Sequence, residues 1–143
     1  MNKYVRKLFG IMFESKQAQQ SIRLQPQQLP TSPLAWRQYW QAEGFPWRTE
    51  PEIGVKRQEE LSSRRVLVPD IERGLYLLKG MQLSRADVEW LLATHENGRG
   101  PVDWSDEHQR QREGLDLRGA DLRQANLAGL PLARILGGLR ELG

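Results

Sequence analysis

The sequence from Leu115 to Arg134 reads LDLRG ADLRQ ANLAG LPLAR, which is four successive blocks of five residues. Each block has leucine at its third position and alanine or leucine at its first position. An α-helix repeats about every 3.6 residues and a strand every second residue, so neither places every fifth residue on one face. Self-similarity at a fixed period is typical of solenoid proteins, in which each repeat packs against its neighbours.

The five-residue period predicts an orientation for each position of a block. If each block forms one side of a square coil, its first and third residues point to the axis, whereas Arg118, Arg123 and the other residues face water. Asp116, Asp121 and Asn126 stand before the central leucines, and such short polar side chains can hydrogen-bond the turning backbone. The predicted inward residues are Leu115, Leu117, Ala120, Leu122, Ala125, Leu127, Leu130 and Leu132.

These blocks resemble the pentapeptide-repeat family, whose quintets follow A(D/N)LXX. The resemblance implies a right-handed quadrilateral β-helix, of which residues 115–134 would form about one coil. Residues 135–143 are then a degenerate repeat or cap, or the array is cut short. Residues 35–114 look similar to the helical segment that precedes such repeats in some bacterial proteins. The expected fold class is therefore a mainly α N-terminal region followed by a short β-helix.

The composition excludes several classes of site. The 143 residues allow one domain, or one small domain with an appendage, and 38% of them are hydrophobic. Cysteine is absent, which excludes a disulfide framework, a thiol nucleophile and a cysteine zinc site. The same absence fits a reducing compartment, so we expect a cytoplasmic protein.

The N-terminal segment, residues 1–31, is predicted to be a basic, partly disordered arm and linker. Residues 1–34 contain five Lys or Arg residues and one Glu, whereas the whole chain has a net charge of +3. The basic character therefore lies mostly in the arm, which makes it weak evidence for a nucleic-acid-binding core. A short amphipathic helix within residues 4–13 could dock on the protein or lie on a membrane surface, but it is too short to span a bilayer.

A helical domain is predicted over residues 32–112, and its first helix carries an aromatic face. Ser32 can cap this helix, Pro33 suits its first position, and Gly44 suits its C-terminal end. The aromatic residues have two interpretations: a stacking platform for bases or a peptide, or the core of a small domain. Few Arg and Lys residues are interleaved with them, which favours the core. They are Trp36, Tyr39, Trp40 and Trp47, with Phe45 between the last two.

Two further helices are predicted from capping boxes, in which a Ser or Thr is followed three residues later by an acidic residue. The first box runs from Thr49 to Glu52 and the second from Ser84 to Asp87. Between the two helices, residues 66–68 form a short strand or an extended connection.

Potential metal ligands gather only around Asp103, Asp106 and His108, with His95 earlier in the chain. Their spacing matches no recurring metal-binding motif, and Ser105 or Asp106 is explained as the cap of a helix through Glu113. We therefore predict no catalytic residue, no cofactor and no metal, in keeping with the resemblance, which implies a non-enzymatic chain.

Two hypotheses for function follow. The first is a protein-interaction or scaffolding module whose partner is a protein, including a second copy stacked end to end on the coil. The second is a nucleic-acid-binding domain that uses the basic arm and the aromatic residues, and its binding would weaken steeply with salt. The candidate interaction residues are Trp36, Tyr39, Trp40, Trp47, Arg118 and Arg123.

Overall fold

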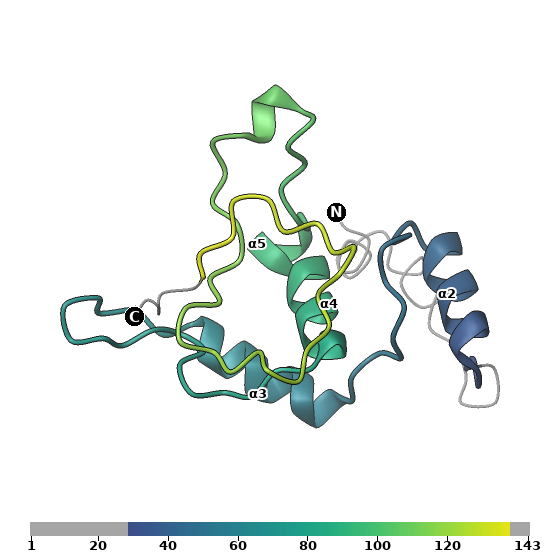
Figure 1. The fold of residues 1–143 in the computed structure, drawn as a ribbon, viewed down its shortest axis with the longest axis horizontal. Coiled ribbons are helices and arrows are strands. Elements are labelled where there is room, and N and C mark those ends of the chain that lie inside the picture. The colour runs from purple at the N-terminus through teal and green to yellow at the C-terminus, as the bar shows by residue number, and fades with distance from the viewer. Residues whose placement is uncertain (1–28, 138–143) are drawn as a thin grey trace. The chain divides into compact units, whose positions relative to one another are not determined.

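A computed structural model describes residues 29–137 (Figure 1). The predicted arm, up to residue 28, and the tail from residue 138 lie outside the described residues. The described residues divide into two compact units, one of residues 29–51 and 92–101 and the other of residues 52–91 and 102–137. The helices within residues 29–137 are α2 (Pro33–Ala42), α3 (Val55–Arg65), α4 (Arg85–Ala93), α5 (His95–Gly98) and the 3-10 helix η2 (Glu107–Gln109).

The first unit contains α2, and the predicted N-terminal cap of this helix at Ser32 is confirmed. The Ser32 hydroxyl oxygen accepts a hydrogen bond from the Ala35 N–H at 3.1 Å, and Pro33 occupies the first turn. After the helix, Gly44 has a φ of +94°, a conformation that suits glycine. Trp40 is 2% exposed, and its indole N–H donates to the Glu50 carbonyl oxygen at 2.8 Å.

In the second unit, the predicted capping box of α4 is confirmed. The Ser84 N–H donates to Asp87 Oδ2 at 2.9 Å, and the Asp87 N–H donates to Ser84 Oγ at 3.1 Å. The predicted box at Thr49 is wrong, because Thr49 Oγ1 donates to the adjacent Glu50 carboxylate and α3 begins only at Val55. The residue before α3 is Gly54, which is extended and offers no side-chain cap.

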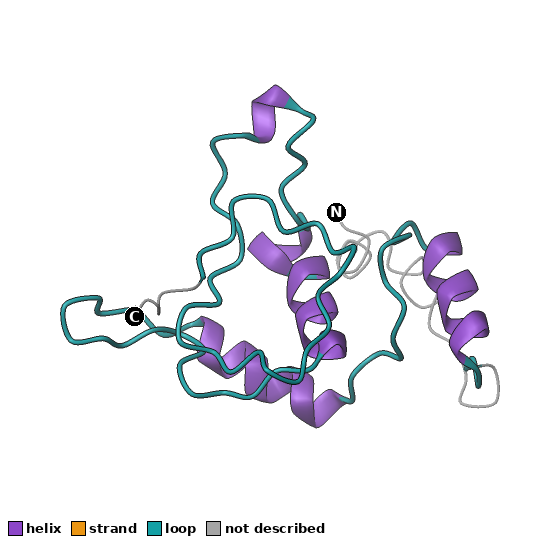
Figure 2. Cartoon of the chain, viewed as in Figure 1, coloured by secondary structure: helices purple, strands orange, loops and turns teal. Residues whose placement is uncertain are grey.

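The predicted right-handed β-helix is wrong, because residues 29–137 contain no β-strand and the chain from residue 114 to 137 is drawn as loop throughout (Figure 2). Within residues 114–137 the only bridges are isolated parallel ones, between Gln82 and Asp121 and between Asp116 and Leu136. A ladder requires consecutive paired residues. Because the repeats form only about one coil, most of their backbone has no adjacent coil to pair with. The pairing is therefore limited to single bridges.

The five-residue period nevertheless governs the local structure. Residues 114–136, here called the circuit, make one turn per block. Hydrogen bonds close these turns at five-residue intervals, from the N–H groups of Ala120, Ala125, Leu130 and Ile135 to the carbonyl oxygens of Leu117, Leu122, Leu127 and Leu132. The circuit returns on itself where the Gly114 N–H donates to the Arg134 carbonyl oxygen at 3.1 Å. Figure 1 shows this closed path in green and yellow.

Asp and Asn support these turns as expected. Asp116, Asp121 and Asn126 each accept, through Oδ1, the N–H group two residues later at 3.1 Å. The predicted role of these side chains at the corners is confirmed.

Arginines from the helices of the second unit hold the loops in place. Arg57 on α3 donates two hydrogen bonds to Asp87, at 3.0 and 2.8 Å, and a third to the Gln82 carbonyl oxygen at 2.9 Å. Hydrogen bonding to Asp87 raises the pKa of Arg57. Burial raises the pKa of Asp87, but the hydrogen bonds from Arg57 and Ser84 outweigh it, so the net shift is downward.

Two other arginines act in the same way on backbone carbonyl groups. Arg64 donates to the carbonyl oxygens of Leu77 and Lys79, at 3.1 and 2.8 Å. Arg85 on α4 donates to those of Asn126 and Ala128 in the circuit, at 2.9 and 2.6 Å. Each arginine therefore connects a helix to a segment without regular secondary structure.

A glycine-to-alanine change at the closing point of the circuit tests its packing. A Cβ atom at Gly114 would lie 2.6 Å from backbone atoms of Ala133 and Arg134. We expect Gly114→Ala to lower the free energy of unfolding by about 2 kcal/mol, because backbone atoms must shift. Gly137→Ala is the control, since among the described residues its Cβ would meet only an Ile135 side-chain atom, at 3.9 Å. Equal melting temperatures for the two variants would contradict this closure.

The Arg57 hydrogen bonds generate a second stability prediction. Arg57→Ala leaves the buried Asp87 carboxylate without its ionic partner, and we expect a loss of about 3 kcal/mol in urea unfolding. Arg73→Ala is the matched control, because Arg73 is exposed and lies 3.9 Å from Asp70, so its loss should cost about 0.5 kcal/mol or less. A similar small loss for both variants would show that Arg57 does not support the fold.

Candidate functional site

A chain segment from outside the repeated blocks, residues 76–83, lies beside the circuit. Residues 76–83 run beside it: the Gly80 N–H donates to the Gly119 carbonyl oxygen, and Asp121 exchanges backbone hydrogen bonds with Met81 and Leu83. This segment has the same local form, with a turn closed by the Met81 N–H and the Leu78 carbonyl oxygen, and a φ of +77° at Gly80. The signal in the sequence is the five-residue spacing of Leu78 and Leu83 across a glycine.

A second neighbour is the end of the circuit itself. The Leu117 N–H donates to the Leu136 carbonyl oxygen at 2.7 Å, and the Leu136 N–H donates to the Leu115 carbonyl oxygen at 2.8 Å. Residues 81–83 instead use the N–H and C=O groups of Asp121. Alternate residues of an extended chain direct these groups to opposite sides, so the two neighbours lie along opposite edges of the circuit.

The edge that pairs with Leu136 is open over the remaining three blocks. Each of these three blocks has one N–H group equivalent to that of Leu117 and one C=O group equivalent to that of Leu115, which gives six groups. None of the six has a hydrogen-bond partner within residues 29–137. We call this set the open edge. It consists of the N–H groups of Leu122, Leu127 and Leu132 and the C=O groups of Ala120, Ala125 and Leu130.

The residues predicted to point inward differ in burial along the circuit. Leu115, Leu117 and Leu130 are buried. The other five, which are Ala120, Leu122, Ala125, Leu127 and Leu132, are half-buried. The open edge is therefore bordered by apolar side chains that water still reaches.

Arg118 and Arg123, predicted as interaction residues, are both bound to the preceding aspartate. Arg118 forms two hydrogen bonds with Asp116, and its guanidinium carbon lies 4.8 Å from the centroid of the Tyr76 ring. Arg123 is exposed and contacts Asp121 in the same two-point manner. Hydrogen bonds from the Arg123 side chain and backbone lower the pKa of Asp121 to about 2.

The predicted aromatic residues contact one another in the first unit. Ring centroids lie 5.7 Å apart for Trp36 and Trp40 and 4.9 Å apart for Tyr39 and Trp40. The Arg48 guanidinium carbon lies 3.6 Å from the centroid of the buried Trp40 ring. Phe45 connects this group to Trp47, with ring centroids 5.8 Å apart. These contacts use ring surfaces that a base-stacking platform would need, so they favour the core interpretation. The nucleic-acid hypothesis stays a prediction.

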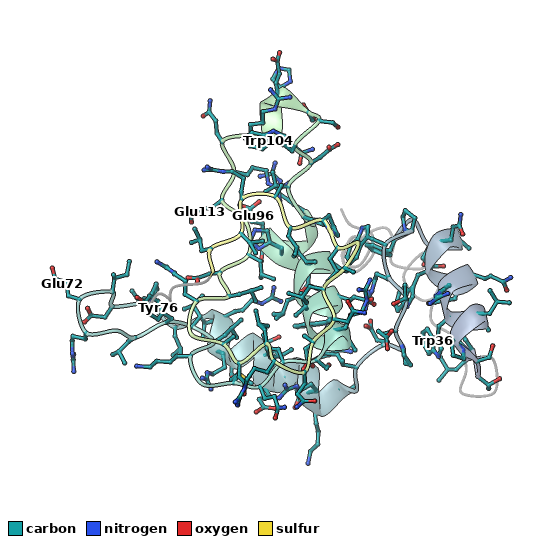
Figure 3. The ribbon with its side chains drawn as sticks, in the orientation of Figure 1. Trp36, Glu72, Tyr76, Glu96, Trp104 and Glu113 are labelled. Atoms are coloured by element: carbon teal, nitrogen blue, oxygen red, sulfur yellow. The ribbon has the colours of Figure 1, made fainter. Side chains whose placement is uncertain are left out.

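An exposed apolar hairpin, residues 66–75, was not predicted as a candidate site. Asp70 and Leu75 exchange two backbone hydrogen bonds, at 2.8 and 2.9 Å, and the loop projects from the second unit with Glu72 near its tip (Figure 3). Val66 and Val68 are 78% and 88% exposed, so the apolar segment predicted as a strand or extended connection lies in water. A hydrophobic pattern alone does not say whether a segment is covered.

A second loop exposes an aromatic side chain. Trp104 is 52% exposed and lies on the loop that carries η2 (Figure 3). The predicted helix through Glu113 is wrong: Asp106 caps only η2, which ends at Gln109.

The described residues were also searched for metal sites and membrane-spanning helices, and the chain was compared with known proteins. Among residues 29–137, no group of three or more His, Cys, Asp or Glu side chains could hold a metal ion. Within the same residues, no helix has the length and apolar character to cross a membrane. Comparison with protein-family models, curated proteins and solved structures found no match to the chain. The pentapeptide-repeat resemblance therefore has no support beyond its quintets.

The pKa of the Asp121 carboxyl group tests the ion pair between Asp121 and Arg123. We expect an NMR titration to place its pKa near 2 in the wild type. Arg123→Ala should raise that pKa toward the usual value of about 3.9, but not fully, because the backbone N–H of residue 123 still donates. Since the folded-state pKa is depressed, this carboxylate stabilises the fold above about pH 4 and loses that effect as the pH falls toward 2. An unshifted pKa in the wild type would contradict the ion pair.

Proposed function

We propose that this chain is a protein-interaction module that pairs through the open edge of its circuit. The observation that supports this proposal is the row of six backbone groups, at five-residue intervals, that have no hydrogen-bond partner among residues 29–137. Unpaired N–H and C=O groups along an edge are a template for pairing with another chain. The half-buried leucines beside them would add apolar contact when a partner covers them.

A second copy of the chain is the partner that fits this edge best. The two segments already beside the circuit, residues 76–83 and residue 136, belong to this chain. One of them, residues 76–83, repeats the circuit's own turn geometry. Every copy carries the same open edge, so a two-fold axis would bury the same groups on both. The proposal requires no catalytic residue and no cofactor.

The oligomeric state tests this proposal. We expect the wild-type mass in light scattering to rise with concentration from 16.5 kDa toward twice that value. Leu132→Arg should weaken the dimer at least about tenfold, because a charge would be buried beside the unpaired groups. Leu127→Arg should have the same effect, since Leu127 is also half-buried at this edge.

The matched control is Ala128→Arg, which adds the same charge at an exposed position of the circuit. Circular dichroism and thermal melting would show that each variant remains folded. A wild-type chain that stays monomeric at the highest concentration reached would refute pairing through the open edge. So would an Ala128→Arg variant that dissociates as readily as Leu132→Arg.

A further inference from the structure

The loop that carries Trp104 is held together by hydrogen bonds from its own side chains. Asp103 Oδ1 accepts hydrogen bonds from the Ser105 N–H at 3.0 Å and the Ser105 hydroxyl at 2.6 Å. Asp106 Oδ1 accepts the His108 N–H at 3.0 Å. We call residues 103–113 the Trp104 loop. These bonds order its first half, and the Asp106 bond caps η2.

The second half of the loop bonds back to the first. Gln109 Oε1 accepts both the Asp103 N–H and Arg112 Nη1, at 2.9 and 2.8 Å. Arg110 Nε donates to the Trp104 carbonyl oxygen at 2.7 Å. The backbone of Trp104 is thus fixed from both sides while half of its side chain faces water. Such preorganisation lowers the entropy cost of binding.

The charge of this loop is opposite to that of the chain. The loop contains four acidic residues and two basic ones, whereas the whole chain has a net charge of +3. The acidic residues are Asp103, Asp106, Glu107 and Glu113, and the basic ones are Arg110 and Arg112. Both arginines are engaged inside the loop. A hydrogen bond from the His108 backbone N–H, above all, lowers the pKa of Asp106, which keeps that carboxylate charged.

The Trp104 ring already contacts one cation. The guanidinium carbon of Arg110 lies 5.3 Å from the ring centroid, within the range of a cation–π interaction. The loop therefore combines an exposed indole, a ring geometry that accepts a guanidinium group, and an excess of carboxylates.

We propose that the Trp104 loop docks on a basic segment of a protein partner, with an Arg or Lys side chain of that segment against the Trp104 indole and the carboxylates beside it. Tryptophan is the aromatic side chain that binds cations best, and it is enriched at interaction hot spots. The negative charge disfavours nucleic acid and anionic lipid, which leaves a protein as the partner class. This surface is separate from the open edge and does not depend on self-pairing.

A short dye-labelled peptide of alternating arginine and glycine is the probe, titrated with the full chain and followed by fluorescence anisotropy. We expect Trp104→Ala to weaken binding about tenfold. Trp104→Phe should retain part of the affinity, because phenylalanine keeps a ring face. Glu107→Gln should weaken binding less and should flatten its salt dependence. Val68→Ala, on the exposed hairpin, is the matched control and should leave the affinity unchanged.

A peptide with citrulline in place of arginine separates charge from shape. It has nearly the same shape and no charge, and we expect it not to bind. Equal binding of both peptides, equal affinity of the wild type and a folded Trp104→Ala variant, or no binding by the wild type would each overturn the proposal. Repeating the titration with Leu132→Arg separates the two surfaces, because that variant should bind the peptide as the wild type does.

Discussion

Arginine side chains provide hydrogen-bond donors that the irregular backbone of the second unit lacks. Strands normally donate hydrogen bonds to the carbonyl groups of their neighbours. Here no strand exists among residues 29–137, so Arg57, Arg64 and Arg85 reach from α3 and α4 to five carbonyl oxygens in the loops. The fold of this unit depends on these planar groups because each can donate in several directions at once.

Arg57 couples this network to the start of α4. Its partner Asp87 is also the acidic residue of the capping box, so one carboxylate accepts hydrogen bonds from the Ser84 backbone and from α3. Arg57 bonds as well to the carbonyl oxygen of Gln82, which belongs to the segment that runs beside the circuit. Helix capping, helix packing and the placement of residues 76–83 therefore share one pair of side chains.

The parts of the fold that the sequence predicts are those decided by near neighbours. The caps at Ser32 and Ser84 are confirmed because each depends on side chains within three residues. The box at Thr49 fails because no helix forms before Val55, which the local pattern cannot reveal. The five-residue period predicts the turns and their Asp and Asn bonds, but strands require neighbours that one coil does not provide.

The candidate surfaces were less predictable for the same reason. Leu78 and Leu83 carry a five-residue spacing, but the segment lacks the Asp or Asn that marks the later blocks. The exposure of Val68 and Trp104 is a tertiary property, since the same residue types at Val88 and Trp90 are buried. Composition could not distinguish these cases.

The meeting of Gly114 with Arg134 has a consequence for how this region can vary in evolution. The two residues stand twenty positions apart, and Arg134 adopts a φ of +64° at the point of closure. Insertion or deletion of a single residue would move every later leucine off its side of the circuit. Insertion of a whole block would preserve that orientation but bring the chain back one corner late, so Gly114 would face a different residue. Related chains should therefore differ here by substitution and keep the same length.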